Sequence, residues 1–295
     1  MKLLVRIVIA FIALVIVIGA VVAVMSNQRL NRTYDIPTSV LALTSPIPSN
    51  GATIARGHHL AVIAGCTDCH AKDLGGKVFL DVPPFLLVAP NLTRGAGGAG
   101  ASFTDADFVR AIRHGVGPDG RAFLIMPAND FNYLSDADLA AIIAYVKSVP
   151  PVERQLPAKS IRPLGRVLLV LNQLPPPPAA VIDHAAAHQA NAPVGATVEY
   201  GHYLANFTGC TDCHRADLTG GPIPGLPPSA PPAQNITPAG IGTWTDVDFY
   251  RALRVGKRPD GSTINTLMPW PDFSQMTDAE IGALLRFVRS VPPKR

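Results

Sequence analysis

The chain has 295 residues, of which 48% are apolar and 16% charged, and its formal net charge is +4. A chain of this length and composition has room for about two folded units with cores of their own, which excludes disorder for most of it. Its lysines and arginines are scattered, which argues against binding to nucleic acid. Frequent prolines and few alternating apolar runs favour helices joined by irregular loops, so we expect an all-α fold.

The N-terminal segment is apolar without interruption from Ile7 to Met25, after Lys2 and Arg6. About 20 such residues span the hydrocarbon core of a bilayer as a helix. We therefore predict a transmembrane anchor over residues 3–25. A cleaved signal peptide is the alternative, but the run is longer than a typical signal core and no Ala-x-Ala sequence ends it. Residues 26–50, which contain several prolines, are expected to form a tether without a core.

A pentapeptide with two cysteines and a histidine occurs twice. Cys66-Thr67-Asp68-Cys69-His70 returns letter for letter as Cys210-Thr211-Asp212-Cys213-His214, and these are the only cysteines in the chain. Cys-x-x-Cys-His is the attachment signature of c-type haem, in which both thiols bond to the porphyrin and the histidine ligates the iron. We predict two covalent haem c groups, attached through Cys66, Cys69, Cys210 and Cys213 and ligated by His70 and His214.

Two other uses of Cys-x-x-Cys pairs remain open. A structural zinc site would bring four Cys or His ligands together, but the two pairs lie in separate copies of a longer repeat. Thioredoxin-like dithiol chemistry needs a βαβ setting, and no strand-rich alternation surrounds either pair.

The chain after residue 50 consists of one domain that has been duplicated. Ala89-Pro90-Asn91-Leu92-Thr93 matches Ala233-Gln234-Asn235-Ile236-Thr237, and similar matches run through both copies. We place the domains at residues 51–152 and 194–295. Each copy is expected to contain three main helices, beginning near residues 53, 104 and 135 in the first copy and near 197, 245 and 277 in the second. Ser or Thr with an acidic residue three positions on predicts N-caps for the second and third helices.

Residues 153–193 form a proline-rich linker between the copies, with a stiff run from Pro175 to Pro178. Val167 to Leu171 is apolar but too short to span a membrane, so we expect it to pack against a domain or a partner subunit. His184 and His188 lie four residues apart. A metal site there is one alternative, and a pair of solvated histidines is the other.

The sixth ligand of each iron decides between an electron carrier and a catalyst. Met126 and Met268 each precede a proline at equivalent places in the repeat. We predict that they complete His70/Met126 and His214/Met268 ligand pairs, whereas Met276 is expected to be a helix-packing residue. His58 and His202 also match in the repeat and offer a bis-histidine alternative, but each lies on the helix before its own motif. His114 has no histidine counterpart.

The two copies resemble the class I cytochrome c family, and more closely the cytochrome c subunits of membrane-bound bacterial alcohol and gluconate dehydrogenases. The motifs that carry the resemblance are Asn235-Ile236-Thr237-Pro238, the segment Asp248 to Arg254, Met268-Pro269 and the final Val291-Pro292-Pro293. It implies that the first and last helices of each copy cross near Gly57 and Tyr145, or near Gly201 and Phe287. It also implies that Asn91 and Asn235 lie near the haem edge.

These features predict a membrane-anchored dihaem cytochrome that transfers single electrons between a periplasmic donor, either a dehydrogenase or a quinol-linked protein, and a respiratory acceptor. A permanent subunit of a dehydrogenase or oxidase complex is the alternative, and a dihaem peroxidase is a third reading that needs an open axial position. Because c-type haem is attached outside the bacterial inner membrane, we expect haem domains in the periplasm and a cytoplasmic N-terminus. No catalytic residue is predicted.

Overall fold

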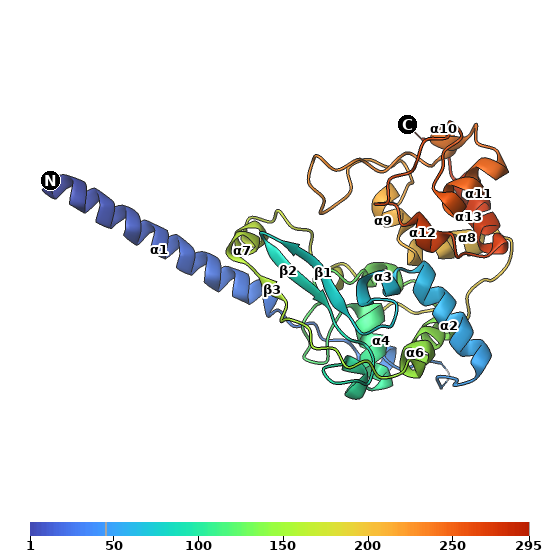
Figure 1. The fold of residues 1–295 in the computed structure, drawn as a ribbon, viewed down its shortest axis with the longest axis horizontal. Coiled ribbons are helices and arrows are strands. Elements are labelled where there is room, and N and C mark those ends of the chain that lie inside the picture. Colours follow the sequence, from blue (N-terminus) through green and yellow to red (C-terminus); the bar gives the residue numbers. More distant parts are fainter. Residues whose placement is uncertain (45, 295) are drawn as a thin grey trace.

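The first helix stands apart from the rest of the chain. The structure is a computed structural model that describes residues 1–44 and 46–294. Helix α1 (Lys2–Leu30) projects away from two helical units (Figure 1). Among the described residues it is the helix that is long and apolar enough to cross a membrane, and its large apolar side chains are exposed up to Met25. The apolar surface of α1 is therefore left for something outside the chain to cover.

Each repeat folds into a set of helices in the same order. The first repeat contains α2 (Gly51–Ile63), α3 (Cys66–His70), α4 (Asp105–His114), α5 (Ala128–Phe131) and α6 (Asp136–Ser148). The second contains α8 (Val198–Phe207), α9 (Cys210–His214), α10 (Pro238–Ile241), α11 (Asp246–Val255), α12 (Trp270–Phe273) and α13 (Asp278–Ser290). Short 3-10 turns lie at Thr38–Val40, Ala99–Ala101 and Pro178–Ala180.

The predicted helix starts are confirmed. The Thr104 side chain accepts from the Asp107 N–H, while the Asp107 carboxylate accepts from the Thr104 N–H, and Thr245 and Asp248 form the same capping box. The ring of Phe103, before the first of these caps, lies 5.4 Å from the ring of Phe108. Such local contacts fix where a helix begins before any tertiary packing forms.

The first and last helices of each repeat cross at a glycine, as the family resemblance implies. A Cβ atom added to Gly57 would overlap the carbonyl group of Ala141 and lie 2.9 Å from the Cβ of Tyr145. In the second repeat, Gly201 meets Ala283 and Phe287 in the same way. Glycine therefore lets α2 lie directly on the backbone of α6, and α8 on that of α13.

Replacing Gly57 by alanine is expected to lower the free energy of unfolding by about 1–3 kcal/mol, because the two backbones must separate to admit the methyl group. Gly51 lies in the same helix, and a Cβ there would meet nothing within 4 Å. Gly51→Ala is the matched control and should change stability by less than about 1 kcal/mol. Denaturant unfolding of both variants measures the difference, and equal midpoints would contradict this view of the crossing.

The expectation of an all-α fold is not met in the first repeat. Strand β1 (Lys77–Val82) pairs antiparallel with β2 (Phe85–Ala89), and β2 pairs with β3 (Ser160–Ile161). The second repeat has a proline-rich loop over residues 222–232, between the isolated bridge partners Gly221 and Ala233. Proline has no N–H to donate to a strand ladder, which explains why the hairpin forms in one copy and not in the other.

The segments on either side of the first repeat lie against it. Ile36 and Leu41 are buried in the core, and the Tyr34 N–H donates to the Gly120 carbonyl at 2.8 Å. In the linker, the Gln189 carbonyl accepts from the Asp136 N–H at 2.9 Å. The expected tether therefore contributes to the core, and the linker follows the surface of the first repeat.

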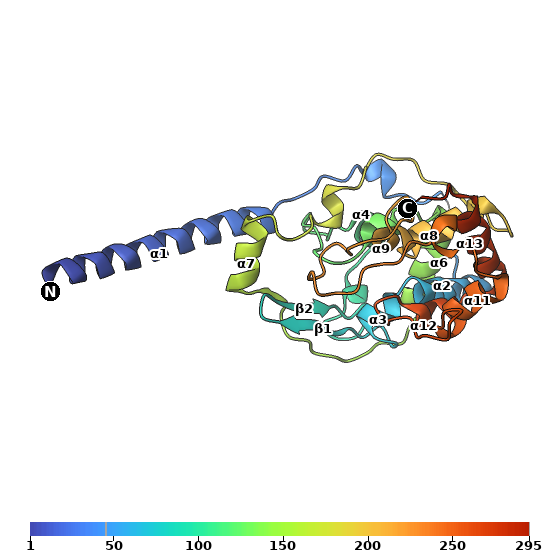
Figure 2. The same ribbon diagram turned by 90° about the horizontal axis from the view of Figure 1, so that it is seen from above.

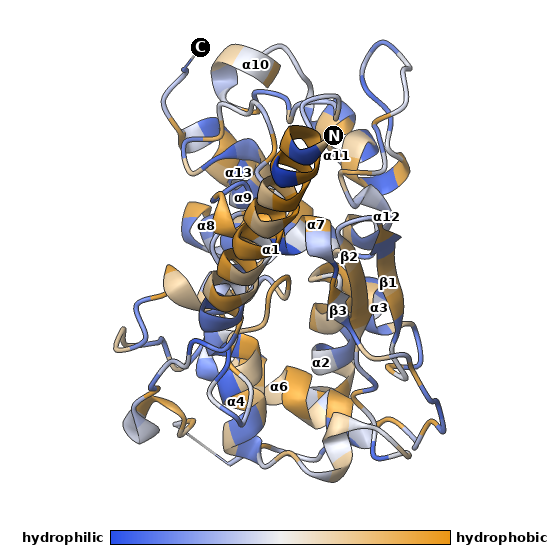
Figure 3. Ribbon diagram, turned by 90° about the vertical axis from the view of Figure 1, so that its left-hand side faces the viewer, coloured by the Kyte–Doolittle hydropathy of each residue, from blue (hydrophilic) through white to orange (hydrophobic). Residues whose placement is uncertain are grey.

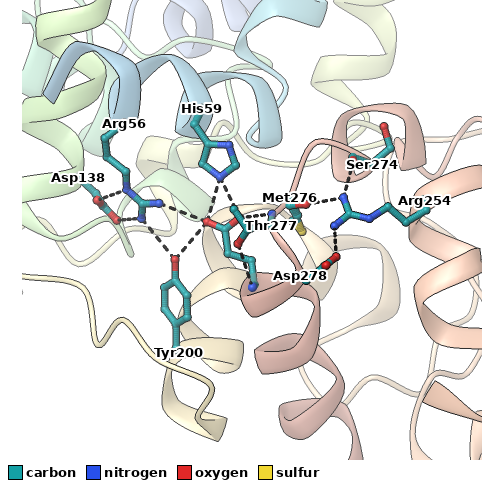
Figure 4. A network of polar contacts seen from close by, with 10 residues as sticks. Arg56, His59, Asp138, Tyr200, Arg254, Ser274, Met276, Thr277 and Asp278 are labelled. Atoms are coloured by element: carbon teal, nitrogen blue, oxygen red, sulfur yellow. Dashed lines mark hydrogen bonds and ion pairs between the residues drawn. The ribbon is translucent and has the colours of Figure 1, made fainter. Parts of the chain in front are cut away.

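The two repeats are joined by a network of polar side chains between α2, α6, α8 and α13 (Figure 4). Glu280 of the second repeat, whose side chain is 3% exposed, accepts hydrogen bonds from Arg56 and from Tyr200, and lies 2.8 Å from Nε2 of His59. Asp138 of the first repeat pairs with Arg56 and accepts from Tyr203 of the second at 2.8 Å. Each buried carboxylate thus takes a partner from the other repeat.

Candidate haem sites

The two cysteine motifs form equivalent short helices, α3 and α9. Gly65 and Gly209, which precede them, adopt φ values of +72° and +75°. These left-handed residues turn the chain sharply after α2 and after α8, and glycine takes up this conformation at little cost. Cysteines three positions apart then lie on the same face of one helical turn. Each motif can therefore present both sulfur atoms to one edge of a porphyrin.

Each motif histidine is oriented by a backbone carbonyl. Nδ1 of His70 lies 2.8 Å from the oxygen of Pro90, and Nδ1 of His214 lies 2.7 Å from the oxygen of Gln234. Because a carbonyl can only accept, the proton must be on Nδ1, which leaves the lone pair of Nε2 for a metal. Burial also lowers the pKa of both histidines and so favours the neutral imidazole that ligation needs.

An asparagine follows each of the two residues, Pro90 and Gln234, whose carbonyls orient the histidines, and its side chain holds that loop in place. The Asn91 side chain donates to the Val152 carbonyl at 2.7 Å and accepts from the Thr93 N–H at 2.9 Å. Asn235 makes the equivalent bonds with Lys294 and Thr237, at 2.7 and 2.9 Å. Asn91 and Asn235 therefore hold in place the loops whose carbonyls accept from His70 and His214, a role that the resemblance did not specify.

Met126 and Met268 occupy equivalent turns, before α5 and α12. Their carbonyls accept from the Ala128 and Trp270 N–H groups, both at 2.7 Å, and their side chains are partly buried against the core. Met276 is 1% exposed and belongs to the core, as expected for a packing residue. The ligand role of Met126 and Met268 stays a prediction.

The rival histidines are engaged elsewhere. The His58 ring packs at a tilt against Tyr145, with the ring centroids 4.9 Å apart, and the His202 ring packs edge-on against Phe287 at 5.1 Å, so both contribute to the helix crossings. Nδ1 of His114 lies 3.1 Å from Nδ1 of His184. Burial, with the two neighbouring histidines and Arg113, lowers the pKa of His114 to about 3, which keeps it neutral.

The donor set fits haem better than zinc or a reactive dithiol. Over residues 1–44 and 46–294, no three His, Cys, Asp or Glu side chains are grouped to hold a metal ion. Burial raises the pKa of the Cys66 thiol to about 12 and that of Cys210 to about 11, whereas disulfide exchange uses the thiolate. The motifs instead offer what haem c needs, two thiols on one turn and an oriented imidazole.

The two sites interlock across the boundary between the repeats. Asn129, directly after Met126-Pro127-Ala128, donates to the Asp212 carboxylate of the second cysteine motif at 3.1 Å. In the reciprocal contact, α12, which follows Met268, contacts α2, and its Asp272 lies beside Asp68 of α3, the cysteine helix of the first repeat (Figures 1 and 2). The sequence analysis missed this contact, although an aspartate four residues after each methionine was a visible repeated signal.

The aspartates that follow the two methionines, Asp130 and Asp272, each lie close to another carboxylate. Burial, together with the nearby Asp212 carboxylate, raises the pKa of Asp130 to about 9. Burial and Asp68 likewise raise the pKa of Asp272 to about 7. Two carboxylates this close are disfavoured when both are ionised. Each reciprocal contact is therefore held in its most stable form when one carboxyl group keeps its proton.

We expect the stability of the protein to fall as the pH rises from about 4 to 9, by up to about 1.4 kcal/mol per pH unit from Asp130 alone. In that window the unfolded chain has released the Asp130 proton and the folded chain still holds it. Asp130→Asn should flatten this slope and leave the variant more stable than the parent protein at pH 8. Thermal unfolding of the haem-loaded chain at several pH values measures this, and an unchanged slope would contradict the proton on Asp130.

Comparison with known proteins places both repeats in one family. The sequence model of the family described as cytochrome c matches residues 54–150 and 198–292. The chain is 29% identical over 280 residues to the fructose dehydrogenase cytochrome subunit of Gluconobacter japonicus, covering 85% of this chain and 55% of that protein. It is 26% identical over 290 residues to a diheme cytochrome c-type protein of Cereibacter sphaeroides, covering 85% of this chain and 93% of the relative.

Further relatives include the cytochrome c subunits of a quinone-dependent alcohol dehydrogenase of Gluconacetobacter polyoxogenes and of a gluconate 2-dehydrogenase of Pantoea cypripedii, both 26% identical. The chain spans little more than half the length of these dehydrogenase relatives. The family match covers both repeats, including the cysteine motifs and the carbonyls that orient their histidines. This chain therefore belongs to the cytochrome c family.

Proposed function

We propose that this chain is a membrane-anchored dihaem cytochrome c that transfers single electrons between redox partners outside the cytoplasmic membrane. The observation that carries the proposal is the repeated bond from a motif histidine to the backbone carbonyl 20 residues further on, at 2.8 Å in one copy and 2.7 Å in the other. This bond prepares an iron ligand, and it occurs beside a complete cysteine pair both times.

The residues assigned to each haem follow from the sites. Cys66 and Cys69 would hold one haem and Cys210 and Cys213 the other, with His70/Met126 and His214/Met268 as the axial pairs. Haem iron supplies a one-electron ferric/ferrous couple, and a thioether ligand favours the ferrous state and raises the potential. With both axial positions filled, the protein would exchange electrons and would not bind a substrate at the iron.

The interlocked sites favour electron exchange between the two haems within one chain. Each methionine loop is supported by the cysteine helix of the other repeat, and the polar network of Glu280 and Asp138 fixes the two repeats to each other. Such a fixed arrangement removes the need for the repeats to reorient before an electron passes between them. An optical redox titration should show two one-electron steps in the range of high-potential cytochromes. The two steps merge into one if the midpoint potentials coincide, so the haem-to-polypeptide ratio is measured in parallel; no redox step, or fewer than two haems per chain, would reject the proposal.

Membership of a dehydrogenase complex is the second candidate, and it is favoured by the similarity to cytochrome subunits of fructose and gluconate dehydrogenases. Those cytochromes are subunits of larger enzymes, whereas the diheme relative from Cereibacter sphaeroides matches this chain over nearly its whole length. Purification from the native membrane in mild detergent distinguishes the two. A free carrier is extracted without another protein, whereas a subunit is extracted in complex with a dehydrogenase. A peroxidase would bind carbon monoxide readily in the reduced state, and we expect no such binding.

A further inference from the structure

Helix α7 (Pro163–Val170) lies beside the C-terminal end of α1, just after the apolar run ends. Arg166 donates to Ser26 at 2.9 Å and to Asn27 at 2.8 Å, and Arg29 donates to Asn172 at 2.8 Å. Ser26 is completely buried by this contact. Since Met25 is the last apolar residue of the run, α7 is held at the depth where a membrane-spanning α1 would reach the bilayer surface.

The axis of α7 runs across that of α1. Figure 2 shows α1 lengthwise and α7 nearly perpendicular to it, and Figure 1 shows α7 almost end-on. A helix perpendicular to the spanning segment lies in the plane of the membrane surface. Figure 3, seen from the side of the N-terminus, shows α7 and the neighbouring strands beside α1, on the face from which α1 projects.

One stripe of α7 is apolar and uncovered. Leu164, Val167 and Leu171 are 49%, 37% and 59% exposed, and their spacing of three and four residues places them on one helix face. Gly165 faces the other way, where a Cβ would overlap the Pro84 carbonyl and lie 2.8 Å from the Phe85 ring. The stripe is thus the side of α7 that the β1–β2 hairpin leaves free.

The charges around the stripe suit a lipid surface. Four arginines lie on α7 or at the base of α1, and no acidic residue occurs from Met1 to Tyr34 or from Arg154 to Ile182. The arginines are Arg29, Arg32, Arg162 and Arg166. Asp81 on β1 pairs with Arg162 at 2.6 Å, which leaves an excess of positive charge. Basic residues beside an apolar helix face are the pattern by which interfacial helices bind anionic lipid.

We propose that α7 is an interfacial helix whose Leu164, Val167 and Leu171 side chains enter the outer edge of the bilayer beside α1. The proposal rests on α1 being a membrane anchor. Because α7 is attached both to α1 and to the hairpin of the first repeat, it would fix the orientation of the haem domains relative to the membrane. A single spanning helix alone would leave the domains free to swing.

Spin labels on introduced cysteines test the proposal in the full-length, haem-loaded protein reconstituted into vesicles of phosphatidylethanolamine and phosphatidylglycerol. The four native cysteines are consumed by haem, so an introduced cysteine is the single reactive thiol. Leu164→Cys, Val167→Cys and Leu171→Cys report on α7, and Val15→Cys reports on α1. Val247→Cys, 72% exposed on α11, is the matched control. The readout is collision with oxygen, which enters lipid, relative to collision with a water-soluble nickel chelate.

We expect lipid-like collision ratios at Val15, intermediate ratios at the three α7 positions and an aqueous ratio at Val247. Aqueous ratios on α7 with a lipid-like ratio at Val15 would overturn the proposal and leave the anchor intact, and would direct attention to a protein partner on this face. An aqueous ratio at Val15 would overturn the anchor and this proposal with it. Haem absorbance confirms that each variant is folded, and three separate α7 positions guard against one damaging substitution.

Discussion

Glu280→Ala is expected to lower the free energy of unfolding by about 3 kcal/mol, because it breaks a buried ion pair and leaves the groups that donate to Glu280 without this acceptor. Glu280 is 2% exposed and is contacted by Arg56 and His59 of the first repeat and by Tyr200. It also accepts from the Thr277 N–H at the start of α13. The substitution therefore removes one of the two bonds of the Thr277–Glu280 capping box together with the contacts that Glu280 makes to the first repeat.

The same residue should make the protein sensitive to acid. Burial alone would raise the pKa of Glu280, but hydrogen bonds from His59 and Thr277 and the charge of Arg56 outweigh it and lower the pKa to about 2. An unfolded glutamate has a pKa of about 4.3. The stabilisation is therefore fully present above about pH 4.3 and is lost as the pH falls towards 2. Glu280→Ala should remove this part of the acid dependence.

Asp246→Ala is the matched control for this experiment. Asp246 also lies in the second repeat and pairs with Arg289, but both side chains are at least half exposed, and such pairs contribute at most about 1 kcal/mol. Denaturant unfolding of both variants at pH 7 and at pH 3 measures the effects. A Glu280→Ala variant as stable as Asp246→Ala would show that the repeats are not held together by this network.

Met268→Ala and Met126→Ala are each expected to lower the midpoint potential of one haem, by on the order of 0.1 V or more within the range of about 0.8 V that axial ligands set. Each should also remove half of the near-infrared absorption that sulfur ligation gives to ferric haem. The methionine thioether stabilises ferrous over ferric iron, so its loss lowers the midpoint potential. Optical redox titration and near-infrared spectra of the purified variants measure both effects.

Met276→Leu provides the control for the ligand variants. Met276 is 1% exposed in the core of the second repeat, and a change to leucine keeps its volume, so stability should change by less than about 1.5 kcal/mol. Its spectrum should match that of the parent protein. Unchanged potentials and spectra in both Met126→Ala and Met268→Ala would show that another group occupies the sixth position.

Local features of the fold were predictable from the sequence because their causes are local. Thr104 and Thr245 cap their helices through residues three positions away. Ser135 likewise accepts from the Asp138 N–H. The Asp138 carboxylate, however, does not return to the cap, because it is taken by Arg56 and by Tyr203 of the other repeat. The capping pattern could not reveal this contact, which depends on how the two repeats meet.

The sheet was missed for one local and one long-range reason. Strands β1 and β2 form a local hairpin, but their apolar residues run consecutively and do not alternate with polar ones. Strand β3 consists of Ser160 and Ile161, and its partner β2 lies far from it in the sequence. Neither so short a strand nor its pairing leaves a period in the sequence. Among the site residues, the cysteines and histidines were predictable from their motif. The support that Asn91 and Asn235 give to the histidine loops was not predictable. Their side chains donate to backbone carbonyls, which every residue has and which therefore leave no pattern in the sequence.

The mass of the purified full-length chain under denaturing conditions tests the central claim most directly. Thioether bonds survive denaturation, whereas a haem held only by its iron ligands is lost. The account predicts the mass of the polypeptide plus two haem groups, and the loss of one haem group when Cys66 and Cys69 are both replaced by alanine. A chain that carries no covalent haem, or that keeps two after this replacement, would contradict it.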